Sequence, residues 1–223
     1  MRPALDLRLY AILDPDRTGG CDPVALAEAA ARGGATLLQL RDKGRNTRRA
    51  VALARTLLAR LTPLGVPLVV DDRVDVALAA GAAGVHLGRE DMAPEDARRL
   101  LGPRAVIGVT AHRPQEVDAI DPAVADYAGL GPVHPTATKD PGDPPLGPEG
   151  LARLIARLRA RAPGFPVVGI AGITAANAAE VIRAGADGVA VISAIFMAED
   201  VEAAARRLRA AVDSALEARR TSP

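Results

Sequence analysis

The chain has 223 residues, of which 49% are hydrophobic and 25% are charged, so it holds enough apolar material for one large domain or two small ones. A formal net charge of +1 and a content of two Phe, two Tyr and no Trp argue against a protein that binds nucleic acid or is drawn to a membrane surface. Cys21 is the single cysteine, which excludes an intramolecular disulfide and a cysteine-based metal cluster.

Short segments rich in leucine and β-branched residues alternate along the chain with longer, alanine-rich amphipathic segments. In chain order, the expected strands are LRLYAIL (7–13), TLLQLR (36–41), PLVVDD (67–72), GVHLG (84–88), AVIGVT (105–110), ADYAGLG (125–131), PVVGIAG (166–172) and GVAVISAIF (188–196). The longer segments predict helices, among them 23–34, 48–61, 94–102, 147–161 and 175–186, and a last long helix over 200–220.

Eight strands that alternate with helices predict an α/β protein with a (β/α)8 TIM barrel. The strands lack a clean polar–apolar alternation, which indicates burial on both faces, as in a parallel sheet joined by right-handed crossovers. No linker divides the chain, so we expect a single domain over 1–223 with a barrel core at about 7–217. A doubly wound open sheet is the alternative fold.

The N-terminal stretch MRPALDLRLYAILD has neither the long apolar core nor the small-residue cleavage site of a signal peptide. No apolar run reaches the length needed to cross a bilayer. We therefore expect a cytoplasmic protein that acts on small molecules and binds neither nucleic acid nor membrane. A barrel of this size is also compatible with a homodimer.

Six of the expected strands end in, or lead into, polar residues or glycines, and the eighth carries Ile192 and Ser193. In chain order they are Arg41, Asp42 and Lys43, then Asp71 and Asp72, Gly88 and Asp91, Thr110, then Thr136, Thr138 and Lys139, Gly172, and finally Ile192 and Ser193. In a TIM barrel the loops at the carboxyl ends of the strands build the active site. Their joint placement therefore predicts one shared ligand site, although each residue alone is more often a solvated surface group.

The residue types at these strand ends indicate two anion-binding subsites. Arg41, Lys43 and Lys139 are suited to phosphate oxygens. Asp72 and Asp91 form a pair suited to Mg²⁺, which keeps several waters and binds substrate phosphates. The glycines and Ser193 near the last two strands offer close backbone approach to a second phosphate.

Seven motifs occur in the order expected of the thiamine-phosphate synthase family, which this sequence resembles from the first strand to the last. They are QLRDK, VVDDRVDVAL, GVHLGREDM, IGVTAH, GLGPVHPTATK, GIAGIT and VISAIF. The resemblance implies a (β/α)8 barrel that joins hydroxymethylpyrimidine diphosphate to a thiazole ethyl phosphate, often the carboxylated thiazole. It further implies that the products are thiamine monophosphate and diphosphate, with carbon dioxide when the carboxylated thiazole is used.

The resemblance also implies a role for each matching residue. The pyrimidine diphosphate would be bound by Gln39, Leu40, Arg41, Asp42, Lys43, Asp71, Thr110 and Lys139, of which Arg41, Lys43, Thr110 and Lys139 would be catalytic. Asp72 and Asp91 would hold Mg²⁺. The thiazole substrate would contact Thr136, Ala137 and Thr138, and its phosphate would be bound by Gly172, Ile192 and Ser193. The implied reaction is a dissociative substitution at the pyrimidine methylene, which needs no general base.

Two departures from the family pattern keep alternatives open. Asp71 stands where the family usually has Asn, and a carboxylate cannot donate to a diphosphate oxygen unless it is protonated. We expect it to turn toward the metal or the solvent and to weaken diphosphate binding. His134 stands where an aromatic residue is common. The alternatives are a thiazole tautomerase of the same fold and a non-catalytic barrel that binds thiamine phosphate. The tautomerase is disfavoured because its acid–base histidine replaces a proline that this chain retains as Pro132.

Overall fold

Eight parallel strands form a closed barrel, and each strand pairs with the next in the chain until β8 pairs with β1. The computed structural model describes residues 5–136 and 144–221. The strands are β1 (Leu9–Leu13), β2 (Leu37–Leu40), β3 (Leu68–Asp71), β4 (Gly84–Leu87), β5 (Val106–Ala111), β6 (Tyr127–Leu130), β7 (Val167–Ile170) and β8 (Gly188–Val191). The predicted barrel is therefore confirmed, and the open doubly wound sheet is wrong.

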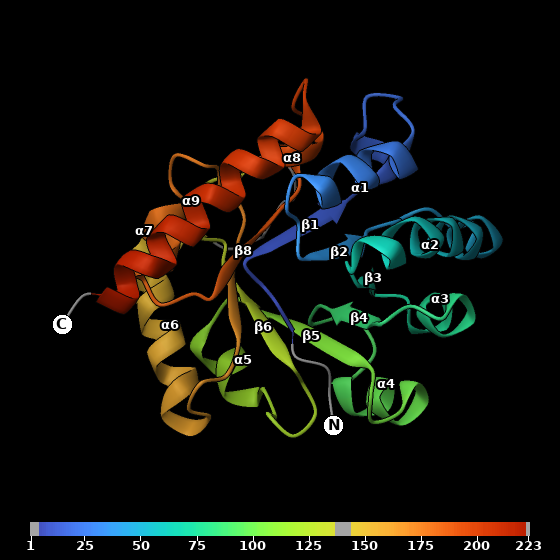
Figure 1. Ribbon diagram of the computed structural model, residues 1–223. Helices are drawn as coiled ribbons and strands as arrows, with labels where there is room; N and C mark the ends of the chain where they lie inside the picture. Colours follow the sequence, from blue (N-terminus) through green and yellow to red (C-terminus); the bar gives the residue numbers. More distant parts are fainter. Residues whose placement is uncertain (1–4, 137–143, 222–223) are drawn as a thin grey trace.

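Helices surround the barrel on its outside (Figure 1). They are α1 (Pro23–Arg32), α2 (Thr47–Leu61), α3 (Val74–Ala80), α4 (Pro94–Leu101), α5 (Pro114–Ala119), α6 (Gly147–Arg161), α7 (Ala178–Arg183), α8 (Ser193–Phe196) and α9 (Val201–Thr221), with short 3₁₀ turns at Pro15–Arg17 and Thr62–Leu64. The long helix α9, which follows β8, packs against both α1 and α7, so it closes the ring of helices between the first and seventh units.

The end of the chain differs from the sequence prediction. We expected one strand over 188–196, but β8 ends at Val191, and Ser193–Phe196 form the helix α8. The backbone N–H groups of Phe196 and Met197 donate to the carbonyl groups of Ile192 and Ser193, as in a helix. Ile195 and Phe196 are buried. A short apolar run of this kind cannot be assigned to strand or buried helix by its periodicity alone.

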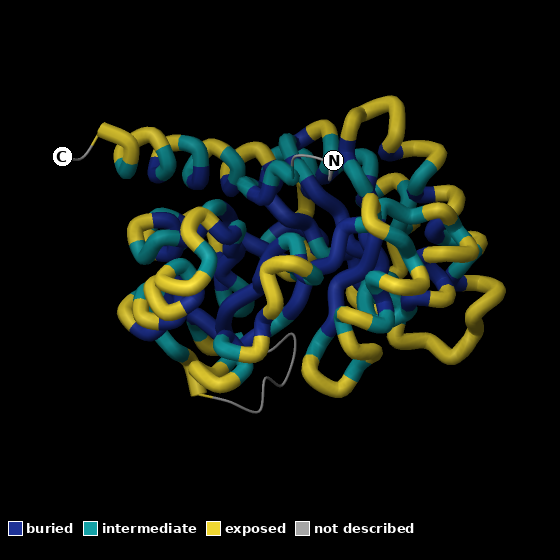
Figure 2. The backbone as a smooth tube through the Cα atoms, turned by 90° about the horizontal axis from the view of Figure 1, so that it is seen from below, coloured by how far each residue is buried: buried dark blue, intermediate teal, exposed yellow. Residues whose placement is uncertain are grey.

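Successive side chains of each strand point alternately out toward the helices and into the barrel. In β1, Leu9, Ala11 and Leu13 belong to the apolar layer between strands and helices, whereas Tyr10 belongs to the cluster inside the barrel. Figure 2 shows the strands as the buried centre and the outer sides of the helices as the exposed surface. The strands are thus buried on both faces, as their composition predicts.

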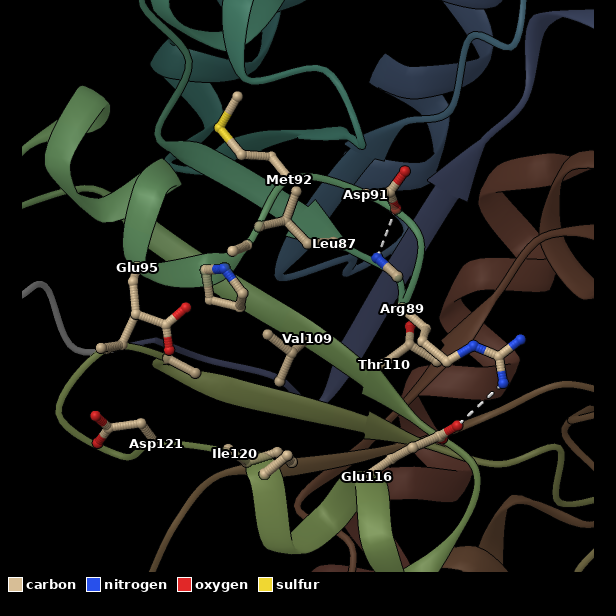
Figure 3. A pocket seen from close by; sticks show the side chains of 16 residues that line it. Leu87, Arg89, Asp91, Met92, Glu95, Val109, Thr110, Glu116, Ile120 and Asp121 are labelled. Carbon is tan, nitrogen blue, oxygen red and sulfur yellow. Dashed lines mark hydrogen bonds and ion pairs between the residues drawn. The ribbon is translucent and has the colours of Figure 1, made fainter.

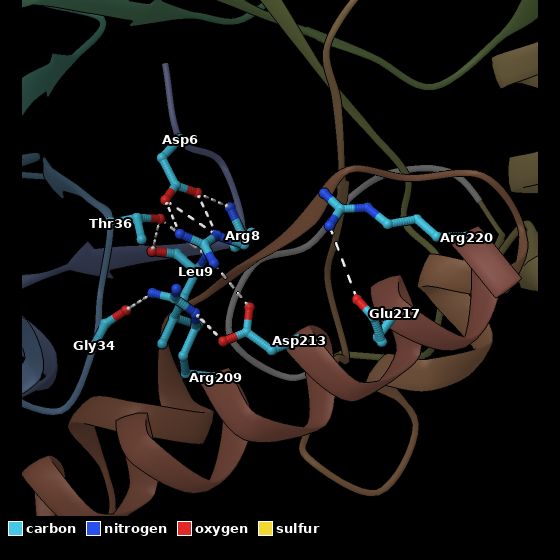
Figure 4. A network of polar contacts seen from close by, with 9 residues as sticks. All are labelled: Asp6, Arg8, Leu9, Gly34, Thr36, Arg209, Asp213, Glu217 and Arg220. Carbon is cyan, nitrogen blue, oxygen red and sulfur yellow. Dashed lines mark hydrogen bonds and ion pairs between the residues drawn. The ribbon is translucent and has the colours of Figure 1, made fainter. Parts of the chain in front are cut away.

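Polar side chains stabilise the amino-terminal end of the barrel, away from the strand ends that carry the predicted site. Arg209 in α9 donates to the carbonyl oxygen of Gly34 at 2.9 Å and to Asp213 at 2.8 Å. Asp213 also lies 3.2 Å from Arg8, which is paired with Asp6 (Figure 4). This network ties α9 to the segment that leads into β1.

Candidate active site

Two carboxylates from neighbouring strand ends meet at the rim of the barrel. Asp72 follows β3 with a φ of 59°, a conformation that is uncommon outside glycine and that Asp tolerates better than most residues. Asp91 lies in the loop after β4, where its Oδ2 accepts a hydrogen bond of 2.7 Å from the Gly88 N–H. Partial burial, then contact with the Asp72 carboxyl group, raises the pKa of Asp91.

This acidic pair, Asp72 and Asp91, fits a divalent cation, because two carboxylates in contact repel each other unless a proton or cation is shared between them. Among the described residues, no group of three or more His, Cys, Asp and Glu side chains forms a metal site made by protein alone. Mg²⁺ does not need one, since it commonly binds one or two carboxylates together with water and substrate phosphates.

Lys43 and Arg41 lie beside the acidic pair. The Lys43 ammonium lies 2.6 Å from Oδ2 of Asp71 and contacts Oδ2 of Asp72. Burial by itself would lower the pKa of Lys43, but the two carboxylates outweigh burial and raise it. Arg41 Nε lies 3.8 Å from the same Asp71 oxygen. Sequence-distant strand ends thus bring two cations and three carboxylates into one cluster.

Asp14, which the sequence analysis missed, holds Arg41 from the other side. Its Oδ2 lies 2.5 Å from Arg41 Nη1 and 3.7 Å from Arg17 Nε, and only 4% of its side chain is exposed. Asp14 directly follows β1, the one strand to which no polar residue was assigned. The strand-end rule, that active-site residues of a TIM barrel follow the carboxyl ends of its strands, would have found Asp14 if it had been applied to β1 as well.

Asp71 differs from its expected orientation. We expected it to turn toward the metal or the solvent, but its side chain is 11% exposed and points toward Lys43 and Arg41. Burial, reinforced by the charge of Asp72, raises the pKa of Asp71 to about 6, even though Lys43 and Arg41 act in the opposite direction. The two cations thus hold a buried carboxylate that is costly to ionise.

The pKa of Asp71 predicts how stability depends on pH in metal-free protein. An acid whose pKa is higher in the folded than in the unfolded state stabilises the fold less as pH rises between those two values, here from 3.8 to about 6. In EDTA, the free energy of unfolding of Asp71→Asn should therefore rise relative to wild type by about 2 kcal/mol between pH 4.5 and 7. Urea unfolding at several pH values measures this difference, and a constant difference would contradict it.

A chain of hydrogen bonds crosses the inside of the barrel and ends at Thr110. Gln39 donates to the Tyr10 hydroxyl, which lies 2.8 Å from the Tyr127 hydroxyl. His86 Nδ1 lies 2.9 Å from that same Tyr127 hydroxyl, and its Nε2 lies 2.7 Å from Thr110 Oγ1. Burial raises the pKa of both tyrosines, so they stay protonated. Neither tyrosine was predicted as a site residue.

The side chains of two other predicted residues at the end of β2, Leu40 and Asp42, are engaged outside the cluster of Arg41, Lys43 and the carboxylates that is described above. The Leu40 side chain is fully buried in the apolar layer between strands and helices, so only its backbone can face a substrate. The Asp42 carboxylate accepts a hydrogen bond of 2.8 Å from the Gly44 N–H and so stabilises its own loop.

The opposite side of the rim carries the residues predicted for the thiazole phosphate. Gly172 has a φ of 67°, and a Cβ atom there would lie 2.5 Å from the Pro135 carbonyl oxygen. The loops after β6 and β7 are therefore in close contact, which by itself requires glycine. Ser193 is exposed at the start of α8, and Ile192 and Thr136 are partly exposed. Ala137, Thr138 and Lys139 lie outside the described residues.

A cavity of about 350 Å³ lies next to the acidic pair, between the loop after β4 and helix α5 (Figure 3). Its lining includes the apolar side chains of Leu87, Val109 and Ile120, and Asp91 and Thr110 also line it. Figure 3 shows the ion pair of Arg89 and Glu116, 3.4 Å long, beside Thr110. The cavity thus extends from the rim into the apolar layer between strands and helices, and Asp91 and Thr110 lie on its border.

The model of one protein family, described as thiamine monophosphate synthase, matches residues 9–195, which include all eight strands. The chain belongs to the thiamine monophosphate synthase family. The resemblance seen in the sequence motifs is thereby confirmed.

Relatives in this family match the chain over nearly its whole length. A thiamine-phosphate synthase of Xanthobacter autotrophicus is 47% identical over 212 residues, which cover 95% of this chain and 98% of the relative. That of Agrobacterium fabrum is 46% identical over 215 residues, with 96% and 98% covered. The solved structure of thiamine phosphate pyrophosphorylase from Pyrococcus furiosus superposes with a TM-score of 0.83 at 38% identity, with 95% and 98% covered.

The helices of this chain cover the outer face of the barrel strands. None of those in the described part of the chain combines the length and the apolar character that a membrane span needs.

Proposed function

We propose that this chain joins hydroxymethylpyrimidine diphosphate to a thiazole ethyl phosphate, releasing diphosphate and forming thiamine monophosphate. One observation carries the proposal: Asp72 and Asp91 meet beside Arg41 and Lys43, so a divalent cation and a diphosphate group can be bound side by side. Membership of the thiamine monophosphate synthase family supports the same reaction.

The diphosphate subsite is formed by the ends of β2 to β5. Arg41 and Lys43 bind its oxygens, joined by Lys139 from the loop after β6, and the Thr110 hydroxyl donates to it. Because His86 lies 2.7 Å from Thr110 Oγ1, the threonine hydroxyl is held in one orientation. Asp72 and Asp91 hold Mg²⁺, which when bound supplies positive charge to the departing diphosphate.

The second subsite takes the thiazole phosphate on the opposite side of the rim. Thr136, Ala137 and Thr138 contact the thiazole, and Gly172, Ile192 and Ser193 bind its phosphate. The strand register supports this grouping, because Ile170 of β7 lies beside Ala190 of β8, so the loops that follow the two strands start next to each other.

The chemistry proceeds by loss of diphosphate before attack. The aminopyrimidine shares the positive charge left at its methylene carbon, while Arg41 and Lys43 stabilise the leaving group. The thiazole nitrogen then attacks with its own lone pair, so no residue has to remove a proton. Catalysis comes from charge stabilisation and from holding the two substrates in line. Because both substrates are soluble phosphates, we propose a cytoplasmic enzyme. It would work as a single domain, without a nucleic-acid or membrane partner.

Thiamine monophosphate formation tests the proposal directly. Purified protein is mixed with hydroxymethylpyrimidine diphosphate, thiazole phosphate and Mg²⁺, and the product is quantified with and without EDTA. We expect product in Mg²⁺ and none above background in EDTA. Folded protein that forms no product would refute the synthase function. Isomerisation of the carboxylated thiazole, or thermal stabilisation by thiamine phosphate without turnover, would then distinguish a tautomerase from a binding protein.

A further inference from the structure

Asp71 occupies the position at which an anionic ligand would meet Lys43 and Arg41. Its Oδ2 lies 2.6 Å from Lys43 Nζ and 3.8 Å from Arg41 Nε. The side chains of Asp71 and Arg41 are only 11% and 17% exposed, so the carboxylate lies largely out of contact with water, where Coulomb attraction is stronger, whereas Lys43 is 42% exposed and reaches it from the solvent side. A diphosphate oxygen that approaches the two cations therefore has to replace a carboxylate rather than water.

Carboxylates outnumber cations at this part of the rim. The described residues gathered there are four carboxylates and three cations: Asp14, Asp71, Asp72, Asp91, Arg17, Arg41 and Lys43. Lys139, predicted for the same subsite, lies outside the described residues and is not included. Each of these three cations is already paired with a carboxylate. Without a divalent cation, a diphosphate group thus meets excess negative charge and occupied cations.

We propose that Asp71 makes the binding of the diphosphate group conditional on the divalent cation, a property that rests on the proposed function. When a divalent cation neutralises Asp72 and Asp91, the balance of charge at Lys43 and Arg41 becomes positive, and diphosphate displaces Asp71. Without the cation, Asp71 keeps both side chains paired. Because such coupling is reciprocal, diphosphate raises the affinity for the cation by the same factor.

Isothermal titration calorimetry with inorganic diphosphate tests this coupling, in Mg²⁺ and in EDTA, with a blank titration for diphosphate binding to free Mg²⁺. The proteins are full-length wild type, Asp71→Asn and Asp75→Asn. The Asp71 substitution keeps the size of the side chain and removes one negative charge. Asp75 is the matched control, since it lies in the first turn of α3, is 60% exposed and pairs with Arg73.

Wild type and Asp75→Asn should bind diphosphate at least about 50-fold more weakly in EDTA than in Mg²⁺. In Asp71→Asn this ratio should fall by about tenfold, because affinity in EDTA rises once Lys43 and Arg41 each lose one of their two carboxylate partners, while Asp72 and Asp14 remain. An unchanged ratio in Asp71→Asn, with its fold intact by circular dichroism, would overturn the proposal. If none of the three proteins binds diphosphate in Mg²⁺, the proposed function fails together with this inference, an outcome distinct from the previous one.

Discussion

Asp91→Asn should slow the metal-dependent formation of thiamine monophosphate by about 10²- to 10³-fold, because the acidic pair loses one of its two charges. The substitution preserves local structure, since an amide oxygen can still accept the hydrogen bond that Gly88 N–H donates to Asp91 at 2.7 Å. The Mg²⁺ concentration that gives half-maximal rate should rise at least about tenfold. Initial rates measured over a series of Mg²⁺ concentrations give both quantities.

Glu90→Gln is the matched control for Asp91→Asn. Glu90 is the preceding residue, and its side chain is 87% exposed with only a 3.5 Å contact to Arg89. Removal of this charge should change the rate by less than about twofold, since exposed charges are screened by water and salt. Equal losses in the two variants would show that overall charge, rather than a metal site at Asp91, controls the rate.

Arg98→Met should lower the free energy of unfolding by about 3–5 kcal/mol, because it leaves a largely buried carboxylate without its counter-charge. The Arg98 side chain is 14% exposed and lies 2.8 Å from Asp126, which is 12% exposed. It also donates to the carbonyl oxygens of Gly102, Ala105 and Val124. Asp126 in turn accepts from the Ile107 N–H at 2.8 Å, so the guanidinium joins α4 to the starts of β5 and β6.

The neighbouring residue provides the control for this stability effect. Arg99 is 77% exposed and pairs with Asp96 one turn earlier in α4. Arg99→Met should change the free energy of unfolding by no more than about 0.5 kcal/mol. Urea unfolding and thermal melts of both variants give the comparison, and Arg98→Met should lose roughly 10 °C in Tm. A loss as small as that of Arg99→Met would mean that Asp126 is satisfied without Arg98.

The strand-end rule accounts for much of the candidate site. It placed Arg41, Lys43, Asp72, Asp91 and Thr110 at one rim, because the carboxyl ends of all parallel barrel strands face the same way. The structure brings the first four of these into one connected cluster and sets Thr110 at its edge. The rule could not state which charges pair, because pairing depends on a few ångströms of side-chain position.

The parts of the site that sequence reasoning missed lie inside the barrel or come from distant segments. Tyr10 and Tyr127 are 117 residues apart and yet share a hydrogen bond of 2.8 Å. In the sequence each is a single aromatic residue within an apolar strand, which is typical of a core residue. Only closure of the barrel places their hydroxyl groups opposite each other, between Gln39 and His86.

By itself, the sequence determined that the protein is a (β/α)8 barrel with charged residues at its carboxyl rim. It could do so because strand burial on both faces and helix amphipathicity are local patterns, readable along a few residues. Only the tertiary structure decided that Asp71 faces Lys43 and Arg41, that Asp14 holds Arg41, and that a run predicted as strand ends in helix α8. Those features depend on neighbours that the chain brings together from different strands, and no local pattern specifies them.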